Sequence, residues 1–277
     1  MIEVGKLNKL TVLRDTSVGM FLGDLLGGEV LLPIKYIPEN TKVDDELEVF
    51  IYKDSEDRII ATNLTPLAQL NSFACLTVSD VSSVGAFLDW GLEKDLLVPY
   101  REQNIHLEVG KKILVYVYLD ETSNRIVASC RLKKFLSEDT PTFEEGEEVD
   151  LIVWHPTELG YNVLINEQFS GVVYANEIFE KLHQGERRKG YIKQVRPDGK
   201  IDVSLQKLGY DQVLSSIDPI LQKLQDAGGT LPIGDKSDPD LIYRLLGMSK
   251  KNFKKAIGSL YKAGKIEIEP NSIRLKE

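Results

Sequence analysis

Val84-Gly85-Ala86-Phe87-Leu88 is the stretch that decides the fold of this chain, because a similar stretch occurs three times. Its counterparts are Val18-Gly19-Met20-Phe21-Leu22 and, from residue 159, Leu-Gly-Tyr-Asn-Val-Leu. A second marker, a basic residue that opens a β-rich run, begins at Arg58, Arg125 and Lys200. The first marker recurs after 66 and then 75 positions, and the second after 67 and then 75. Two markers that step together indicate an internal repeat.

Each repeat has the pattern of five short strands. In the third repeat the β-rich runs predict strands at 149–154, 161–165, 171–174, 189–195 and 200–205. A short helical stretch is expected at 175–183, between the third and fourth strands, and Pro197-Asp198-Gly199 is a turn by its chemistry. The first two repeats follow the same plan. Five strands with a helical link after the third describe an OB-type Greek-key barrel.

After Tyr210 the apolar spacing becomes helical. One helix face runs from 213 to 224, and Asp218-Pro219 either kinks that helix or starts it. Further helices are expected at 239–246 and 250–263, followed by short strands at 265–269 and 272–276. Three helices and a terminal hairpin predict a winged helix. The chain is therefore expected to be mainly β, with three tandem OB-fold five-stranded barrels at 1–66, 67–138 and 139–210 and a winged-helix domain at 211–277.

The second repeat carries a specific resemblance. Its segments at 85–88, 96–99, 109–113 and 125–129 resemble the RNA-binding domain named after ribosomal protein S1. The similarity covers about residues 5–209 in three copies. With the C-terminal domain, the whole chain resembles the conserved virulence factor B family of bacterial RNA-binding proteins. This resemblance implies RNA binding in the regulation of gene expression, including virulence regulation.

Charge is unevenly distributed along the chain. The net charge is −9, which counts against strong binding of nucleic acid, because affinity for phosphate is mostly electrostatic. Residues 213–277 carry 11 Lys and Arg against 8 Asp and Glu, a balance of +3, so the remainder carries −12. Any phosphate contact is therefore expected to be local.

The sequence also bears on the compartment. No apolar run approaches the roughly 18 residues that span a membrane, and the N-terminus lacks the pattern of a signal peptide. The two cysteines, Cys75 and Cys130, are few for a secreted protein of this size, which favours a reducing, cytoplasmic location.

The resemblance to S1-type domains places one aromatic platform on strand two and another on strand three. Counting by register puts Phe21, Phe87 and Val163 at the strand-two position and Leu32, Val98 and Tyr174 at the strand-three position. No repeat has both aromatics, and the first two repeats are rich in acidic residues. They are expected to act mainly as spacers or protein-binding surfaces, with Phe21 and Phe87 either RNA platforms or core residues.

The third repeat has the composition that single-strand binding needs, because aromatic residues alternate with cations. The candidate RNA-binding residues are Tyr161, Tyr174, Tyr191, Arg187, Arg188, Lys189, Lys193, Arg196 and Lys200. The alternative is that the tyrosines pack the barrel and the cations form a solvated edge.

The last predicted helix adds a second candidate surface. Projected at about 100° per residue, Lys251, Lys255 and Lys262 share one side, roughly opposite Phe253 and Ile257. This is the layout of a recognition helix, with one face in the core and a basic face toward phosphate. A solvated lysine face is the alternative.

No pattern for catalysis was found. The three histidines are widely spaced, so no metal site is expected, and no phosphate-binding glycine loop or nucleophile motif occurs. The sequence predicts a non-enzymatic protein without cofactors that binds single-stranded RNA with little sequence preference. The alternatives are a DNA-binding regulator that acts through the winged helix, and a protein-binding scaffold.

Overall fold

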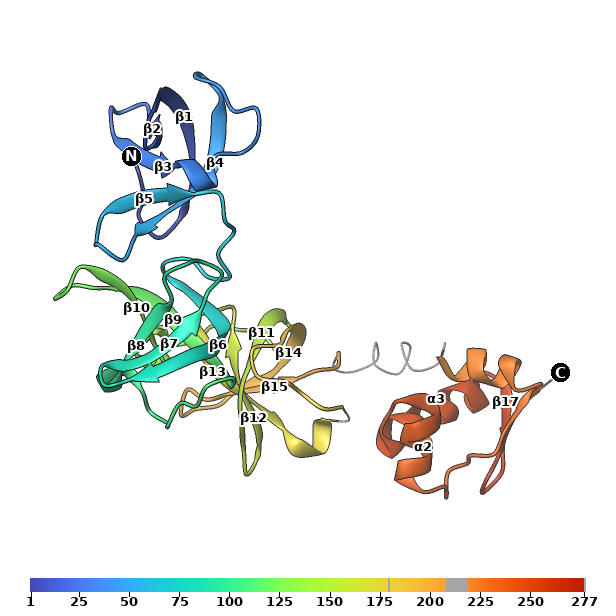
Figure 1. Cartoon of the computed structure of the whole chain (residues 1–277). Coiled ribbons are helices and arrows are strands. Elements are labelled where there is room, and N and C mark those ends of the chain that lie inside the picture. The colour runs from blue at the N-terminus through green and yellow to red at the C-terminus, as the bar shows by residue number, and fades with distance from the viewer. Residues whose placement is uncertain (179, 208–218, 277) are drawn as a thin grey trace. The chain divides into compact units, whose positions relative to one another are not determined.

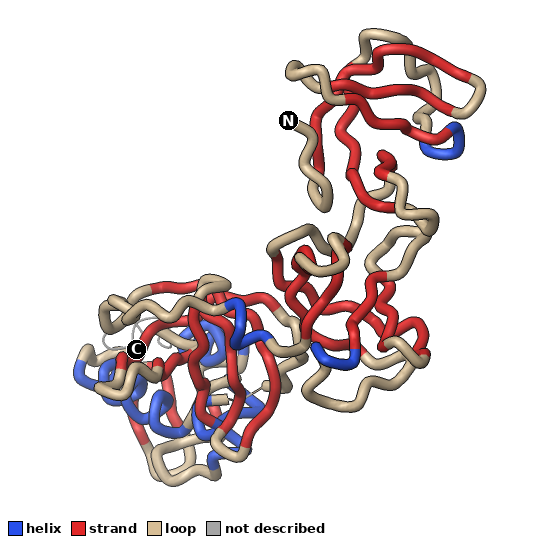
Figure 2. Tube along the Cα trace, turned by 90° about the vertical axis from the view of Figure 1, so that its left-hand side faces the viewer, coloured by secondary structure: helices blue, strands red, loops and turns tan. Residues whose placement is uncertain are grey.

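The computed structural model describes residues 1–178, 180–207 and 219–276. The chain divides into two compact units, Met1–Leu136 and Ser137–Glu277. Figure 1 follows the elements from the first strands in blue to the C-terminal helices in red. Figure 2 shows that strands dominate the chain and that helices concentrate near its C-terminus.

Barrel 1 is a closed five-stranded barrel with the strand order β1-β2-β3-β5-β4. Its strands are β1 (Leu7–Thr16), β2 (Gly19–Gly23), β3 (Glu29–Pro33), β4 (Glu46–Lys53) and β5 (Ile59–Thr62). Barrel 3 is also closed, in the equivalent order. It consists of β11 (Glu148–Thr157), β12 (Gly160–Ile165), β13 (Phe169–Tyr174), β14 (Arg187–Val195) and β15 (Ile201–Ser204).

Barrel 2 has its five strands in the equivalent order, but its third and fifth strands are not joined by hydrogen bonds. Its strands are β6 (Ser72–Ser82), β7 (Gly85–Asp89), β8 (Leu96–Pro99), β9 (Lys112–Asp120) and β10 (Arg125–Ser129). They form a sheet in the order β10-β9-β6-β7-β8, in which β8 and β10 are in contact without pairing. The predicted mainly β architecture of three repeated five-stranded units is confirmed.

The repeated glycine is required by close backbone contact. Gly19, Gly85 and Gly160 have φ angles of 143°, 151° and 149°, which L side chains rarely adopt. A Cβ atom at these positions would lie 2.2, 2.2 and 2.1 Å from the carbonyl oxygen of Leu32, Val98 and Val173, respectively. Any side chain here would force the second and third strands apart, which explains why the marker recurs.

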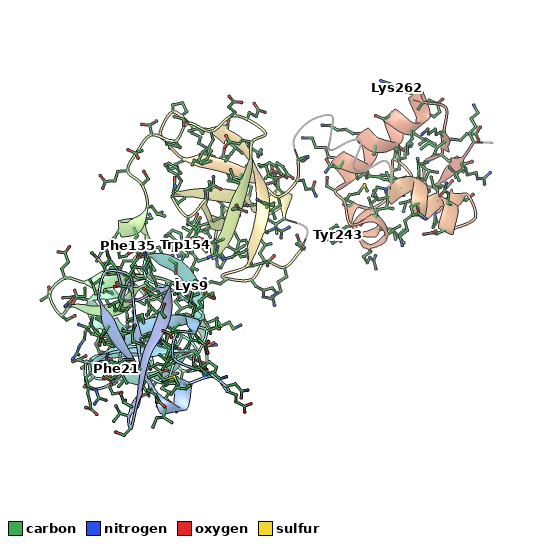
Figure 3. The ribbon with its side chains drawn as sticks, turned by 90° about the horizontal axis from the view of Figure 1, so that it is seen from above. Lys9, Phe21, Phe135, Trp154, Tyr243 and Lys262 are labelled. Carbon is green, nitrogen blue, oxygen red and sulfur yellow. The ribbon has the colours of Figure 1, made fainter. Side chains whose placement is uncertain are left out.

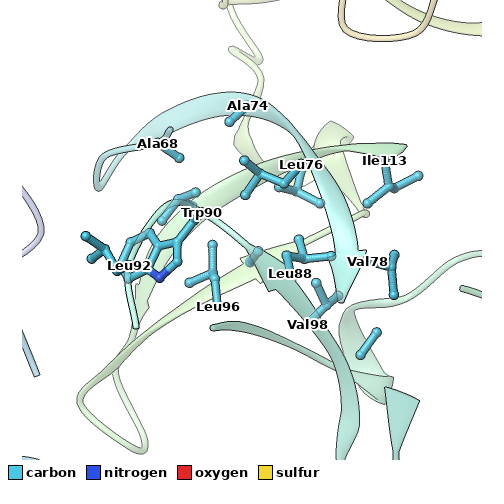
Figure 4. Close-up of a cluster of buried hydrophobic side chains, with 14 of the residues drawn as sticks. Ala68, Ala74, Leu76, Val78, Leu88, Trp90, Leu92, Leu96, Val98 and Ile113 are labelled. Atoms are coloured by element: carbon cyan, nitrogen blue, oxygen red, sulfur yellow. The ribbon is translucent and has the colours of Figure 1, made fainter. Parts of the chain in front are cut away.

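The hydrophobic core of barrel 2 extends to three residues of barrel 1, Phe50, Tyr52 and Ile60, while barrel 1 also has a core of its own. The edge of the Trp90 ring packs on Phe50 of barrel 1 at 5.7 Å between centroids, with the ring planes at 88°. Trp90 is 3 % exposed and lies among the buried side chains drawn in Figure 4. Ion pairs join Lys35 to Glu93 and Arg125 to Asp57 across the same contact. The predicted boundary at 66/67 therefore lies inside one compact unit, and the four domain limits remain predictions.

The helical stretch expected at 175–183 is wrong for most of its length. Among the described residues 175–178 and 180–183, the structure has one 3-10 turn, η4 (Ala175–Glu177), and residue 179 lies outside the described residues. Equivalent turns follow the third strand in barrels 1 and 2. Ile178 is extended, with φ −101° and ψ 115°. The sequence spacing of Ile178 and Leu182 is that of a helix, but the backbone is already extended at Ile178. Both apolar side chains are at least partly buried without forming a helix.

The C-terminal domain is a winged helix. Residues 219–226 are helical, and α2 (Pro239–Leu246) and α3 (Lys250–Lys262) begin at the caps Asp238 and Ser249. The wing is the hairpin of β17 (Ile266–Ile268) and β18 (Ile273–Leu275). A strand that the sequence did not suggest, β16 (Thr230–Leu231), pairs with β18. The predicted start of the first helix at 213–218 lies outside the described residues.

Candidate nucleic-acid interface

The two phenylalanines of the repeat point out of their barrels. Phe21 and Phe87 are half-buried and lie outside the core clusters, so the core alternative for them is not supported. Phe21 is opposite Arg14 on β1, whose guanidinium carbon lies 4.2 Å from the ring centroid. Figure 3 labels Phe21 on barrel 1. Phe87 lines a cavity of about 250 Å³, together with Tyr52 and Lys53 of barrel 1.

The strand pairings change the register counted for barrel 3. Phe21 pairs with Leu31 and Phe87 with Leu97, both two residues after the repeat glycine. The residue two after Gly160 is Asn162, which pairs with Val172. Val163, the residue expected at this position, is completely buried in the core. The bulky aromatic of barrels 1 and 2 is therefore replaced by an amide in barrel 3.

The register counted for the third strand of each barrel is also changed by the strand pairings. Tyr174 pairs with the repeat glycine Gly160, as Pro33 and Pro99 pair with Gly19 and Gly85. Leu32 and Val98, expected to match Tyr174, are completely buried and match the core residue Val173. Tyr174 is half-buried on the outer side of barrel 3.

Tyr174 is held among polar groups of the strands β14 and β15, of the turn between them and of the 3-10 turn η4. Its hydroxyl donates to Asp202 Oδ1 at 3.2 Å and accepts a hydrogen bond from Arg196. Lys193 Nζ and the Arg196 guanidinium carbon lie 6.0 and 5.8 Å from the ring centroid. Lys193 also pairs with Glu177 at 2.5 Å. The arrangement fixes an aromatic ring with two cations nearby, which is the basic element of a single-strand binding surface.

Asp202 is the centre of this network. It is 4 % exposed, and burial by itself raises the pKa of its carboxyl group. Hydrogen bonds from Gln194 at 2.7 Å and from Arg196 at 3.0 Å outweigh that effect and hold the pKa below its usual value. The ionised carboxylate therefore anchors both the tyrosine hydroxyl and the arginine.

The other two candidate tyrosines have different surroundings. Tyr161 pairs with the core residue Val173 and occupies the inward register of Met20. Tyr191 donates to Glu148 Oε2 at 3.1 Å, and Lys207 Nζ lies 5.9 Å from its ring centroid. The structure therefore does not place Tyr161 on the outer side with Tyr174.

The register of β14 also gives Tyr191 a packing counterpart in each of the other barrels. It corresponds to Phe50 of barrel 1 and Tyr116 of barrel 2. Phe50 packs on Trp90, and Tyr116 stacks on Phe135 at 4.2 Å between centroids. Barrels 1 and 2 thus use this position for packing against a later segment of the chain.

All six candidate cations of barrel 3 are in ion pairs. The shortest N–O distances are 2.5–2.9 Å, for the pairs Arg187–Glu167, Arg188–Glu180, Lys189–Asp150, Lys193–Glu177, Arg196–Asp202 and Lys200–Asp198. The exposed pairs among them, such as Arg187–Glu167 and Lys200–Asp198, are weak, so a phosphate group can compete for those cations. The local positive charge is nevertheless smaller than the sequence suggested.

The lysines of α3 are less compensated. Phe253 and Ile257 are buried, and Lys251, Lys255 and Lys262 are exposed, as the helical projection predicted. Within the described part of the chain, no carboxylate lies within 4.0 Å of these three ammonium groups. Figure 3 labels Lys262 at the end of the helix.

Some site types are not found in the structure. No group of three or more His, Cys, Asp or Glu residues that could hold a metal ion occurs in residues 1–178, 180–207 and 219–276. No helix in those ranges has the length and apolar character needed to cross a membrane. Burial raises the pKa of the Cys130 thiol to about 12.

Comparisons with known proteins agree with this architecture. The S1 domain family matches residues 4–64 and 72–131, and the CvfB-like winged helix domain family matches residues 218–275. The Bacillus subtilis protein YitL is 31 % identical over 93 % of this chain and 88 % of its own length. Conserved virulence factor B of Staphylococcus aureus is 29 % identical over 84 % of this chain and 82 % of its own.

A similar protein from Staphylococcus haemolyticus, also named conserved virulence factor B, is 26 % identical over 98 % of this chain and 94 % of its own. A crystal structure of a multidomain protein with nucleic acid binding domains from Streptococcus pneumoniae aligns over 99 % of this chain and 98 % of its own. Its sequence identity is 23 % and its TM-score 0.43. None of these relatives has a name that denotes an enzyme.

Proposed function

The chain belongs to the conserved virulence factor B family, and from this premise we propose that it binds single-stranded RNA with little sequence preference. In this proposal it is a cytoplasmic, non-catalytic protein that regulates gene expression after transcription. The S1 domains make it a nucleic-acid-binding protein, and the choice of RNA and the regulatory role are what the proposal adds.

The observation that carries the proposal is the surroundings of Tyr174. An aromatic ring fixed through its hydroxyl, with Lys193 and Arg196 near its face, can stack on any base while the cations attract the backbone. The exposed lysines of α3 offer a second phosphate contact. Both features lie in the unit Ser137–Glu277.

The proposal is tested by titrating the full chain with single-stranded RNA and with duplex DNA at several salt concentrations. RNA should bind more tightly, and the logarithm of its affinity should fall with the logarithm of salt by about 0.7 per phosphate neutralised. The cause is release of counterions from the RNA. An affinity for RNA that does not change with salt would show that the cations of barrel 3 and α3 do not contact the RNA phosphates.

The alternative of a DNA-binding regulator is favoured by one observation, the uncompensated lysines on α3. A recognition helix of a winged-helix domain can present such a face to duplex DNA. Tighter binding of duplex DNA than of RNA in the same titration would support this alternative. The scaffold alternative predicts that neither nucleic acid binds.

The double change Lys251→Glu and Lys255→Glu should weaken RNA binding by about tenfold, since each replaced cation removes a phosphate contact and adds repulsion. The fold should survive, because both residues are exposed and point away from Phe253. Fluorescence anisotropy measures the affinity, and circular dichroism checks the fold.

The matched control is Lys223→Glu with Lys236→Glu, which makes the same change of charge at exposed positions outside α3. It should weaken binding much less. Equal losses for the two pairs would mean that only the overall charge of the domain matters and that α3 is not a contact surface.

A further inference from the structure

The outer side of barrel 3 differs chemically from that of barrels 1 and 2 at equivalent positions. In barrel 1, the neighbours Arg14, Phe21, Leu31 and Ile60 occupy strands one, two, three and five. The corresponding neighbours in barrel 3 are His155, Asn162, Val172 and Asp202. In barrel 2 the first three are Asp80, Phe87 and Leu97. A mostly apolar surface has thus become one rich in hydrogen-bonding groups.

Asn162 is oriented by its cross-strand neighbour. Its side-chain nitrogen lies 3.2 Å from His155 Nε2, and His155 Nδ1 lies 3.1 Å from the carbonyl oxygen of Pro156. One neutral tautomer satisfies both contacts, with Nδ1 donating to Pro156 and Nε2 accepting from Asn162. This contact uses one N–H of the Asn162 side-chain amide. The side-chain carbonyl oxygen and the second N–H have no hydrogen-bond partner among the described residues.

Tyr174 lies near Asn162 on the same side of the sheet. Asn162 pairs with Val172 on β13, and Tyr174 is the next residue of that strand with its side chain on the same side. Diagonal neighbours of this kind are about 7–8 Å apart, within the reach of an aromatic ring. A half-buried amide with a donor and an acceptor to offer therefore stands beside a fixed aromatic ring.

We propose that barrel 3 reads the edge of one unstacked RNA base through Asn162, with His155 as the residue that positions the amide. Tyr174 provides the stacking surface for that base or its neighbour. The inference rests on the proposed function and deepens it, because one position of an otherwise sequence-tolerant surface then discriminates among bases.

The chemistry of the amide fits a base edge. Adjacent donor and acceptor groups on a base are matched by the carboxamide of Asn or Gln, and single-stranded RNA exposes such edges. Phenylalanine at the same position in barrels 1 and 2 offers only a ring face, which every base can stack on. At this position we therefore expect a base-selective contact in barrel 3, which has Asn162, and an unselective contact in barrels 1 and 2, which have Phe21 and Phe87.

The test titrates the full chain with four single-stranded RNA homopolymers of equal length. The wild-type chain should bind one homopolymer about tenfold more tightly than the weakest, the discrimination that one good amide–base contact supplies. Asn162→Phe should reduce that ratio to about one while binding of the weaker homopolymers is kept. This substitution is compatible with the fold, because Phe occupies the equivalent position in the other two barrels.

His155→Ala separates positioning from folding. It should weaken binding of the preferred homopolymer more than binding of the other three, whereas a loss of structure would weaken binding of all four alike. Thermal unfolding of each variant checks that barrel 3 is intact.

Phe87→Asn is the matched control, because it places the amide in barrel 2, where Pro99 occupies the position of Tyr174 and provides no aromatic ring to hold a base beside the amide. It should leave the ratio unchanged. Equal binding of the four homopolymers by the wild-type chain would overturn the inference, as would a ratio that Asn162→Phe leaves intact. Failure of the wild-type chain to bind any of them would instead contradict the proposed function.

Discussion

Trp90→Ala should destabilise barrels 1 and 2 together, by about 3–5 kcal/mol, the usual cost of removing a buried tryptophan side chain. Trp90 is 3 % exposed, donates from Nε1 to the Lys94 carbonyl oxygen at 2.6 Å and packs on Phe50. Because Phe50 belongs to barrel 1, the cavity weakens the hydrophobic cluster that joins the two barrels. Denaturant unfolding followed separately for the units Met1–Leu136 and Ser137–Glu277 measures the effect.

Leu25→Ala is the control, because Leu25 is an apolar residue of the same unit that is fully exposed, and it should change the stability by less than about 0.5 kcal/mol. The second unit should unfold as in the wild type in both variants. If Trp90→Ala split the unfolding of the unit Met1–Leu136 into two steps and shifted only one of them, the two barrels would not unfold cooperatively.

Tyr174→Ala should weaken RNA binding by about 1–3 kcal/mol if a base stacks on the ring. The substitution removes the aromatic surface near Lys193 and Arg196 and also the hydroxyl that donates to Asp202. Isothermal titration with a single-stranded RNA oligonucleotide measures the loss.

Tyr174→Phe distinguishes the two contributions, because it keeps the ring and removes the hydroxyl. It should retain most of the affinity, with a small loss from the less rigid ring. Equal losses in the two variants would assign the effect to the Asp202–Arg196 network and would argue against stacking at Tyr174.

The repeat was readable in the sequence because its markers have strict structural causes. The glycine at 19, 85 and 160 is required by contact with a carbonyl oxygen, so no other residue can replace it without moving a strand. The α3 helix was predictable because one cap and one apolar face define it. Both features depend on residues close together in the sequence, so the sequence pattern is sufficient to predict them.

The composition of the candidate site was harder to predict. Asn162 is two residues after Gly160, as Phe21 and Phe87 are two residues after their glycines. The apolar run at 163–165 led instead to Val163, which is a core residue. The ion pairs of barrel 3 could not be read from the sequence, because Glu167 and Glu177 meet Arg187 and Lys193 only after the strands pair. The same holds for the burial of Asp202 against Tyr174.

The most direct test of the proposed function is the RNA affinity of the two compact units, residues 1–136 and 137–277, measured against the full chain. Residues 137–277 contain Tyr174, its neighbouring cations and the lysines of α3, and we expect this fragment to keep most of the affinity. We expect residues 1–136, which contain neither Tyr174 nor the lysines of α3, to keep little of it. An N-terminal fragment that bound RNA as tightly as the full chain would contradict the proposal and would move the binding surface to Phe21 and Phe87.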